Sequence, residues 1–578
     1  MKTPLSVVFC LLSSALVAEI QPLWPEGKIP HFQPNQVAAP SQEVSKPGFD
    51  RAAHQMPYLD WDEKPANPNG ACVILISGGG YNCTCDGPAF KQLEKKMLDN
   101  GITCVWLWYR SPRPQGLPIY QSGWEDGQRA VRLVRAAAKE RGFDPERIGV
   151  LGCSAGSHLC VMLGTSALTP AYEKVDAVDD IPCHVNWAMP MCPAYALTDG
   201  LTTANSRDGD APDVKLNPSF KFDAKTCPMC LFHGGNDQYS PNGSTQLYRQ
   251  LRRMKIPAEL HLDPDRGHGP VDAAKFERAI EFMRQMGYLG ELDPEVELMK
   301  RYPNDSARGS YEKEDIWPKD KIPDMQTNQC TPYLEWHMPK ELKTKAIQII
   351  YSGGSYMGNG PDGFEVAPAR RFLNERGMTV VTMRYRCPNK DRVRKHVAPW
   401  ADLQRAIRIV RSKAAEKGLD PNRIGIMGSS AGGHLTLMGA TSSLHNAARG
   451  DWWTPSGLDA IPCNVQWAVA IYPAYGLTDG VDRGNTTGGN DDSARLVPEF
   501  SFDLATCPIL FIHGDADGWA AMNSVKCWEQ LRRMGIQGEL HTLATRNHCF
   551  QRNAAPGTGS YTWMDRIWEF MSHKGYNK

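Results

Sequence analysis

The chain has 578 residues, and its 64 lysine and arginine residues are balanced by 64 aspartate and glutamate residues. This length exceeds what one hydrophobic core usually organises, so it favours two large domains. The absence of net charge argues against a protein whose main partner is nucleic acid, because such a protein needs an excess of basic surface.

The N-terminal segment MKTPLSVVFCLLSSALVA has the form of a secretory signal peptide. One lysine precedes an apolar run that is too short to span a membrane, and small residues follow at Ser13, Ala15 and Ala18. No later stretch is long and apolar enough to span a bilayer. We therefore expect residues 1–18 to be removed and the mature protein to be secreted or periplasmic, without a membrane partner.

Apolar segments typical of strands alternate with helical patterns through the first half of the chain. The predicted strands are, in order, residues 71–77, 103–109, 147–152, 184–191, 229–234 and 258–263. A helix is predicted over 124–141, where Ala130, Val131, Val134 and Ala137 recur at helical spacing. Strands that are almost continuously apolar and alternate with helices indicate the α/β class, with a mostly parallel sheet flanked by helices.

The cysteines, 17 in all, would be free to form disulfides in an exported protein. Several, such as Cys72 and Cys104, lie in the predicted strands, where a free thiol packs as a small hydrophobic group. Cys83 and Cys85 are too close in sequence for an easy bridge, and no cysteine spacing is typical of zinc. We expect most cysteines to be buried free thiols, and any pairing stays open.

The second half of the chain repeats the first. LWPEGKIP at 23–30 recurs as IWPKDKIP at 316–323, and DPERIGVLGCSAGSHL at 144–159 recurs as DPNRIGIMGSSAGGHL at 420–435. Matching segments keep their order. The offset is 276 residues for the DPERIGVL and DPNRIGIM segments and 280 for the later QLRRMKIP and QLRRMGIQ segments, which is far too long for a solenoid repeat. We therefore predict two tandem domains, at 19–289 and 316–578, joined by a polar linker at 290–315.

Each half carries a GxSxG motif directly after a predicted strand, with Ser154 in GCSAG and Ser430 in GSSAG. A serine hydroxyl is a weak nucleophile at neutral pH and needs an adjacent base. A sharp turn from strand to helix, which small flanking residues permit, lifts such a serine above the sheet as a nucleophile elbow. The motif alone is weak evidence, because glycine-rich turns of this kind also bind phosphates.

An acid and a histidine follow each serine in the chain order expected for such an elbow. Asp237 and Asp517 lie just past a predicted strand, and His268 and His548 lie in a loop after the next strand. In this interpretation the histidine accepts the serine proton, while the aspartate fixes the imidazole tautomer and stabilises its cation. The sequence therefore predicts two complete catalytic triads.

Glycine-rich loops after an early strand, SGGGY and SGGSY, are predicted to supply oxyanion donors, together with the backbone N–H after each nucleophile. The candidates are Gly79, Gly80, Tyr81 and Ala155 in the first half and Gly354, Ser355, Tyr356 and Ala431 in the second. Tyr239 and Trp519 lie two residues past each acid. They could bind an acyl or sugar ring or only pack the loop, and neither interpretation is favoured.

Other polar residues of these segments have plainer explanations. Structural roles are assigned to two pairs of histidines, namely His158 and His434 in the helix after each serine, and His233 and His513 at a strand end. Asp199 and Asp479 are rival acids but occur one strand too early. Cys153 is out of register with the nucleophile position. No HExxH or similar spacing predicts a metal, and no cofactor is predicted.

The set GGGY, WYR at 108–110, WEDGQRA, GCSAGSHL, HGGND and GHG resembles the α/β-hydrolase carbohydrate esterases, and most closely the bacterial feruloyl and acetyl xylan esterases. The resemblance covers nearly all of both halves. It implies release of acetyl or hydroxycinnamoyl groups from hemicellulose, with an esterified polysaccharide or oligosaccharide as partner. The second half departs from the pattern at Ser355, where the first has Gly80, and beside His548, which lacks flanking glycines.

Two other functions stay open on the sequence. An exported serine peptidase of the prolyl-oligopeptidase type would use the same fold and residue order, although no run of short strands predicts the propeller that such enzymes usually carry. A non-catalytic carbohydrate-binding protein that kept the hydrolase fold is the other alternative. The two full sets of serine, acid and histidine favour the esterase.

Overall fold

The computed structural model describes residues 19–33, 51–52, 56–61, 64–85, 87–198, 214–291, 294–296, 300, 311–390, 395–445, 457–478 and 494–578. The predicted signal peptide and the rival acids Asp199 and Asp479 lie outside the described residues. Among the helices of the described ranges, none has the length and apolar character needed to cross a membrane.

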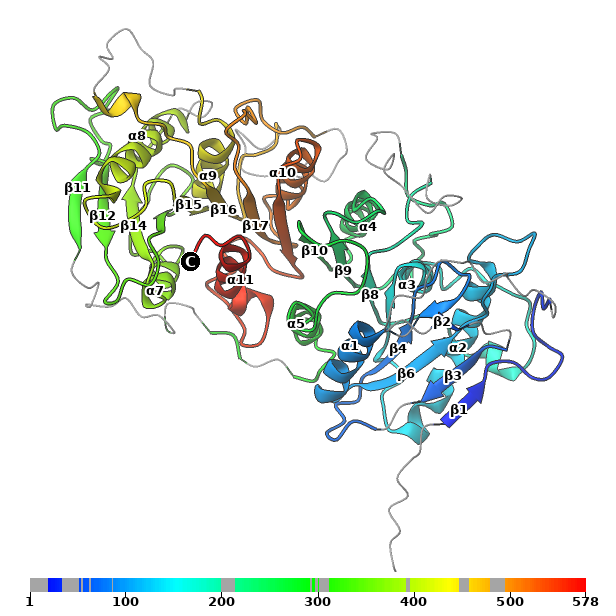
Figure 1. Ribbon diagram of the computed structural model, residues 1–578. Coiled ribbons are helices and arrows are strands. Elements are labelled where there is room, and N and C mark those ends of the chain that lie inside the picture. Colours follow the sequence, from blue (N-terminus) through cyan, green and yellow to red (C-terminus); the bar gives the residue numbers. More distant parts are fainter. Residues whose placement is uncertain are drawn as a thin grey trace, which may run out of the picture.

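The first half forms a mostly parallel sheet with helices on both faces (Figure 1). Its strands are β1 (Glu19–Pro22), β3 (Tyr58–Trp61), β4 (Cys72–Ile76), β6 (Thr103–Trp108), β7 (Ile148–Cys153), β8 (Trp187–Met191), β9 (Met229–Gly234) and β10 (Ala258–Asp263). Its helices are α1 (Pro88–Asp99), α2 (Gln121–Arg141), α3 (Ala155–Thr165), α4 (Asn242–Arg253) and α5 (Glu277–Gln285), with a 3₁₀ turn η1 (Ala177–Asp180). A separate ribbon pairs β2 (Arg51–Ala52) with β5 (Thr84–Cys85).

The second half repeats this arrangement. Its strands are β11 (Glu312–Asp315), β12 (Tyr333–His337), β13 (Ile347–Tyr351), β14 (Thr379–Arg384), β15 (Ile424–Ser429), β16 (Trp467–Ile471), β17 (Ile509–Gly514) and β18 (Gly538–Leu543). Its helices are α7 (Ala367–Glu375), α8 (Val397–Ala414), α9 (Ala431–Thr441), α10 (Met522–Arg533) and α11 (Gly559–His573), with a 3₁₀ turn η4 (Gly457–Ala460).

Strand β11 corrects the linker prediction, because it lies inside the range 290–315. It pairs antiparallel with β12 as β1 pairs with β3, so the second fold unit begins with β11 and not at residue 316. Its sequence EKED is polar, and a polar strand at the edge of a sheet carries no hydrophobic signal. The strands and the helix predicted for the first half are confirmed, apart from shifts at their ends.

Packing on both faces of the sheet explains why the sequences of the central strands are almost continuously apolar. Helices α2, α3 and α4 cover one face of the first sheet, and α1 and α5 cover the other. Strands β4, β7, β8 and β9 are therefore buried along their whole length. The described cysteines are unbridged and most are buried, in agreement with their prediction as small hydrophobic groups.

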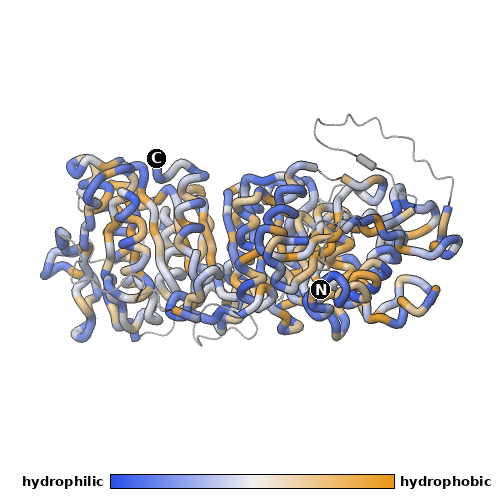
Figure 2. Tube along the Cα trace, turned by 90° about the horizontal axis from the view of Figure 1, so that it is seen from below, coloured by the Kyte–Doolittle hydropathy of each residue, from blue (hydrophilic) through white to orange (hydrophobic). Residues whose placement is uncertain are grey.

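The two sheets join edge to edge into one sheet of 16 strands. β10 pairs antiparallel with β18, with His261 opposite His541, and the halves lie end to end in an elongated molecule (Figures 1 and 2). Arg249 of α4 pairs with Glu529 of α10 across the seam at 2.6 Å. Because β9 runs parallel to β10 and β17 parallel to β18, the carboxyl edges of the two halves point in opposite directions.

Candidate active sites

Each GxSxG serine forms a sharp turn between a strand and a helix. Ser154 joins β7 to α3 with φ 58° and ψ −121°, and Ser430 joins β15 to α9 with φ 57° and ψ −121°. A positive φ is costly for a residue with a side chain, so close packing must hold it. A Cβ on Gly152 would lie 2.3 Å from the carbonyl oxygen of Gly156, which explains the glycines of the motif.

In the first half the structure brings the predicted serine, acid and histidine together. His268 Nε2 lies 2.8 Å from Ser154 Oγ, and its Nδ1 lies 2.9 Å from both carboxylate oxygens of Asp237. The aspartate side chain is fully buried, whereas that of the histidine is 24% exposed. The hydroxyl and imidazole can therefore meet an incoming substrate, and the carboxylate cannot.

The second half contains the same set with the same geometry. His548 Nε2 lies 2.8 Å from Ser430 Oγ, and its Nδ1 lies 2.7 Å from Asp517 Oδ2. The aspartate side chain is again fully buried and that of the histidine 25% exposed. Each set therefore contains the serine, the histidine and the acid that acyl transfer through a serine would need.

The buried aspartate of each set has partners besides the histidine next to the serine. His233 Nε2 lies 3.3 Å from Asp237 Oδ2, and the Tyr239 backbone N–H donates to Asp237 Oδ1 at 2.8 Å. Burial alone would raise the pKa of Asp237, but hydrogen bonds from His233 and His268 outweigh it and lower the pKa below its ordinary value. The carboxylate therefore stays ionised opposite His268.

His233 and His513 are buried, as their prediction as structural residues requires, but that prediction missed their contact with the acid. His513 Nε2 lies 3.3 Å from Asp517 Oδ2, which matches the first half. The signal was present in both copies as a histidine four residues before the aspartate, in HGGND and HGDAD. Such spacing across a turn at a strand end places the two side chains together.

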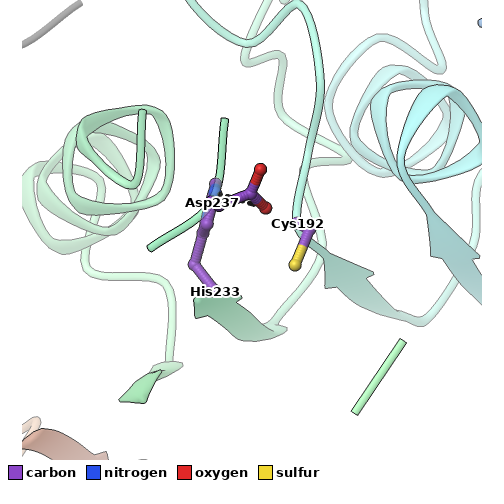
Figure 3. Close-up of side chains that lie close together, drawn as sticks. All are labelled: Cys192, His233 and Asp237. Atoms are coloured by element: carbon purple, nitrogen blue, oxygen red, sulfur yellow. Dashed lines mark ion pairs between the residues drawn. The ribbon is translucent and has the colours of Figure 1, made fainter. Parts of the chain in front are cut away.

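Figure 3 shows Cys192 and His233 beside Asp237. The sulfur, nitrogen and oxygen atoms that could bind a metal ion lie within 4.8 Å of one another in these three side chains. These atoms are already engaged. His233 Nδ1 lies 2.8 Å from Ser244 Oγ, and the Cys192 thiol donates to the Gly269 carbonyl at 3.2 Å. Burial raises the pKa of Cys192 well above its ordinary value, so the thiol stays protonated. We interpret the cluster as packing that supports the acid and assign no metal to it.

The glycine-rich loops lie against the serines, as predicted oxyanion loops should. A Cβ on Gly78 would lie 2.9 Å from Ser154 Cβ, and a Cβ on Gly353 would lie 2.6 Å from Ser430 Cβ. The predicted donor residues of these loops all have positive φ, namely Gly79, Gly80, Tyr81, Gly354, Ser355 and Tyr356. The other predicted donors, Ala155 and Ala431, begin α3 and α9, so their N–H groups stand at the helix N-termini beside the serines.

The tyrosine of each loop is anchored to the histidine of the elbow helix. Tyr81 OH lies 2.8 Å from His158 Nδ1, and Tyr356 OH lies 2.8 Å from His434 Nδ1. Burial lowers the pKa of His158 to about 3, so its ring is neutral. Both histidines therefore hold the loop in place, which agrees with the structural role predicted for them.

Aromatic rings lie close to the histidine of each Ser–His–Asp set. The ring of Tyr239 lies 4.9 Å from His268, and that of Trp519 lies 6.5 Å from His548. Sequence reasoning missed Tyr195, whose ring stacks on the tyrosine of the oxyanion loop, and its counterpart Tyr475, 4.4 Å from Trp519. Both belong to the repeated segment PAY, which was a usable signal.

The second site has a polar cluster formed by Glu365 and Tyr472. Glu365 Oε2 accepts from the Gly353 N–H at 2.7 Å, and the Tyr472 hydroxyl donates to Glu365 Oε1 at 3.2 Å. The Tyr472 ring lies 4.7 Å from His548, whereas the residue after the corresponding strand β8 is Cys192. Burial raises the pKa of Glu365 above its ordinary value. The side chains that pack behind the two histidines therefore differ in chemistry.

Comparison with known proteins places both halves in one family. A family model described as BD-FAE matches residues 61–251 and 334–527, one segment in each half. Both matched segments include the GxSxG turn, and together they make up more than half of the chain.

Two curated relatives match parts of the chain. The first, endo-1,4-beta-xylanase B of Butyrivibrio fibrisolvens, is 26% identical over 34% of this chain and 32% of its own length. The second, an acetylxylan esterase of Xylanibacter ruminicola, is 36% identical over 18% of this chain and 21% of its own length. The chain thus spans a third or less of either relative. Among solved structures, an acetyl ester-xyloside bifunctional hydrolase from Caldicellulosiruptor lactoaceticus is 24% identical, covering 47% of this chain and 92% of its own, at a TM-score of 0.33.

Proposed function

The chain belongs to the BD-FAE family, and on that premise we propose that it is a secreted serine carbohydrate esterase with two working sites. It removes acetyl or feruloyl groups from a hemicellulose such as xylan. The observation that carries the proposal is the pair of Ser–His–Asp sets, each joined by contacts of 2.7–2.9 Å. The names of the acetylxylan esterase and xylanase relatives support the substrate class.

In this mechanism the first step forms an acyl-enzyme. His268 Nε2 takes the proton of Ser154 Oγ as the oxygen attacks the ester carbonyl carbon, and Asp237 stabilises the resulting imidazolium through Nδ1. The carbonyl oxygen becomes an oxyanion beside the Ala155 N–H and the Gly79–Gly80 backbone. The tetrahedral intermediate then collapses, and the imidazolium returns its proton to the departing sugar hydroxyl.

The second step releases the acid. A water molecule gives a proton to His268 and attacks the acyl carbon, and collapse of the second intermediate returns the proton to Ser154 Oγ. Ser430, His548 and Asp517 perform the same steps in the other half. Both steps need the aspartate ionised, which the histidine bonds to each carboxylate favour.

The test replaces Ser154 and Ser430 with alanine, singly and together, and measures hydrolysis of acetyl and feruloyl model esters and acetylated xylan. Each single variant should keep part of the activity and the double variant should lose at least about 10³-fold. The matched control is Cys153→Ser, which changes the residue next to the nucleophile to the one that the second half has there, Ser429. It should stay active.

The outcomes separate the proposal from its rivals. A fully active double variant would refute the serine mechanism, and loss of all activity in one single variant would refute two working sites. Cleavage of dipeptide amides in preference to esters would favour the prolyl-oligopeptidase type. A chain that takes no fluorophosphonate label at either serine would instead be a binding protein.

A further inference from the structure

The two halves can be aligned without a gap along the segment that leads into the helix beside each site. Arg110 Nε donates to Asp126 Oδ1 at 3.0 Å, and Arg386 Nε donates to Asp402 Oδ1 at 2.9 Å. The two residues of each pair are separated by the same number of positions, so every residue between them has a defined counterpart in the other half.

This alignment shows a change of charge. Ile119 and Tyr120 of the first half correspond to Lys395 and His396 of the second. The rings confirm the correspondence, because Tyr120 lies 5.6 Å from the elbow-helix histidine of its half and His396 lies 5.5 Å from that of the other. An apolar residue at the first site is thus a lysine at the second.

Lys395 stands at the rim of the second site. Its Nζ lies 3.4 Å from the ring centroid of Tyr475, within the range of a cation–π contact. Tyr475 in turn lies 4.4 Å from the ring of Trp519, which neighbours His548, and its hydroxyl interacts with the side chain of Ser355 in the oxyanion loop. One side chain, Tyr475, therefore separates Lys395 from Ser355 of the predicted oxyanion loop.

The charge of Lys395 also acts on His434, the buried histidine of the elbow helix in the second half. Burial alone lowers the pKa of His158 in the first half, whereas at His434 the positive charges of His396 and Lys395 add to the effect of burial. Together with the ring contact, this effect places Lys395 on the oxyanion-loop side of the second site.

We propose that the second site prefers esters that carry a carboxylate close to the scissile bond, that the first site prefers neutral esters, and that Lys395 determines this difference. The inference rests on the proposed esterase function. A carboxylate bound at the rim would meet an ammonium that is half-buried against the Tyr475 ring, so the attraction exceeds that of a fully exposed pair. The carboxylate can belong to the sugar, as in a uronic acid, or to the acyl group.

The experiment uses the full chain with Ser154→Ala, so that only the second site works. One arm compares acetylated xylo-oligosaccharides with and without a uronic acid substituent, and the other compares 4-nitrophenyl acetate with 4-nitrophenyl hydrogen succinate. The quantity measured is the ratio of kcat/KM for the anionic and neutral members of each pair. Lys395→Met should lower that ratio about tenfold in the arm that matches the carboxylate's position.

Three further variants make the test decisive. Lys395→Arg should keep the ratio, which separates the charge from the packing of the side chain. Lys390→Met, at an exposed lysine of the same segment, should leave the ratio unchanged. Ile119→Lys, in a chain with Ser430→Ala, should raise the ratio at the first site.

A ratio that Lys395→Met leaves unchanged in both arms, with hydrolysis of the neutral esters intact, would overturn this inference and leave the esterase function standing. A Ser154→Ala chain that hydrolyses none of the four esters would overturn the function proposed for the second site, and this inference with it. The high-salt behaviour gives a separate check, because raising the salt concentration should lower the ratio in the parent and not in Lys395→Met.

Discussion

The seam between the halves contains a buried row of four ionisable side chains whose titration can be tested. Glu259 Oε2 lies 3.0 Å from His261 Nε2, the Nδ1 atoms of His261 and His541 are 2.9 Å apart, and His541 Nε2 lies 2.7 Å from Glu539 Oε1. Only one proton fits between two Nδ1 atoms at this distance. The row therefore holds a small, defined number of protons.

Burial sets the titration of this row. It raises the pKa of Glu259 to about 8 and that of Glu539 to about 7, although the charges of Arg566 and Arg278, respectively, act in the opposite direction. Burial also lowers the pKa of both histidines well below the ordinary value. Because the folded state holds a carboxyl proton in this row that the unfolded state has released, these groups favour folding at low pH.

We predict that Glu259→Gln makes the protein less sensitive to rising pH. The stability contributed by protonated Glu259 is complete below the unfolded pKa of about 4.5 and is lost as the pH rises through the folded value of about 8. The loss is at most about 1.4 kcal/mol per pH unit for one carboxyl. Relative to the parent, the variant should therefore gain at least about 1 kcal/mol of unfolding free energy between pH 6 and pH 8.

The assay is urea unfolding followed by fluorescence at pH 6, 7 and 8, comparing parent and variant at each pH. The control is Glu341→Gln, whose side chain is 78% exposed, and its difference from the parent should stay constant with pH. Parallel pH curves for the parent and Glu259→Gln would refute the reasoning, because they would mean that Glu259 is already ionised in the folded protein at pH 6.

Three other changes have definite expectations, the first two in a chain whose first site is inactivated. His513→Gln should lower kcat/KM about tenfold and shift the pH–rate profile, because it removes the Nε2 contact with the ionised Asp517 and with the Trp519 carbonyl beside it. Gly353→Ala should abolish fluorophosphonate labelling of Ser430, since the new Cβ would lie 2.6 Å from the serine Cβ. Arg386→Met should destabilise the protein by about 3–5 kcal/mol in urea unfolding, because it leaves the fully buried Asp402 without its cationic partner.

The fold and the Ser–His–Asp sets were predictable because their signals are local. Each elbow is a short motif that needs glycine on both sides of a strained serine, and the buried strands are apolar on both faces. The acid and the histidine follow each serine in a fixed order at strand ends, so counting strands is enough to find them.

What the sequence could not predict depends on contacts between distant segments. Nothing in AELHLD or GELHTL indicates that β10 and β18 pair with each other, since either could be an ordinary edge strand. β11 escaped detection because its side chains are polar and mostly exposed. Glu365 and Tyr472 are 107 residues apart in the chain, and only the folded structure shows that they meet beside His548.

The seam makes the two sites independent in chemistry but not in folding. The carboxyl ends of the strands lie on opposite edges of the common sheet in the two halves, and each Ser–His–Asp set lies at the edge of its own half. One ester therefore cannot contact both sets. An isolated half, however, would expose the edge of β10 or β18 with its unpaired N–H and C=O groups. It would also expose polar groups that the other half satisfies, such as Tyr248, whose hydroxyl donates to Asp515 at 2.8 Å. Inactivation of one serine within the full chain is therefore the way to assign an activity to each site.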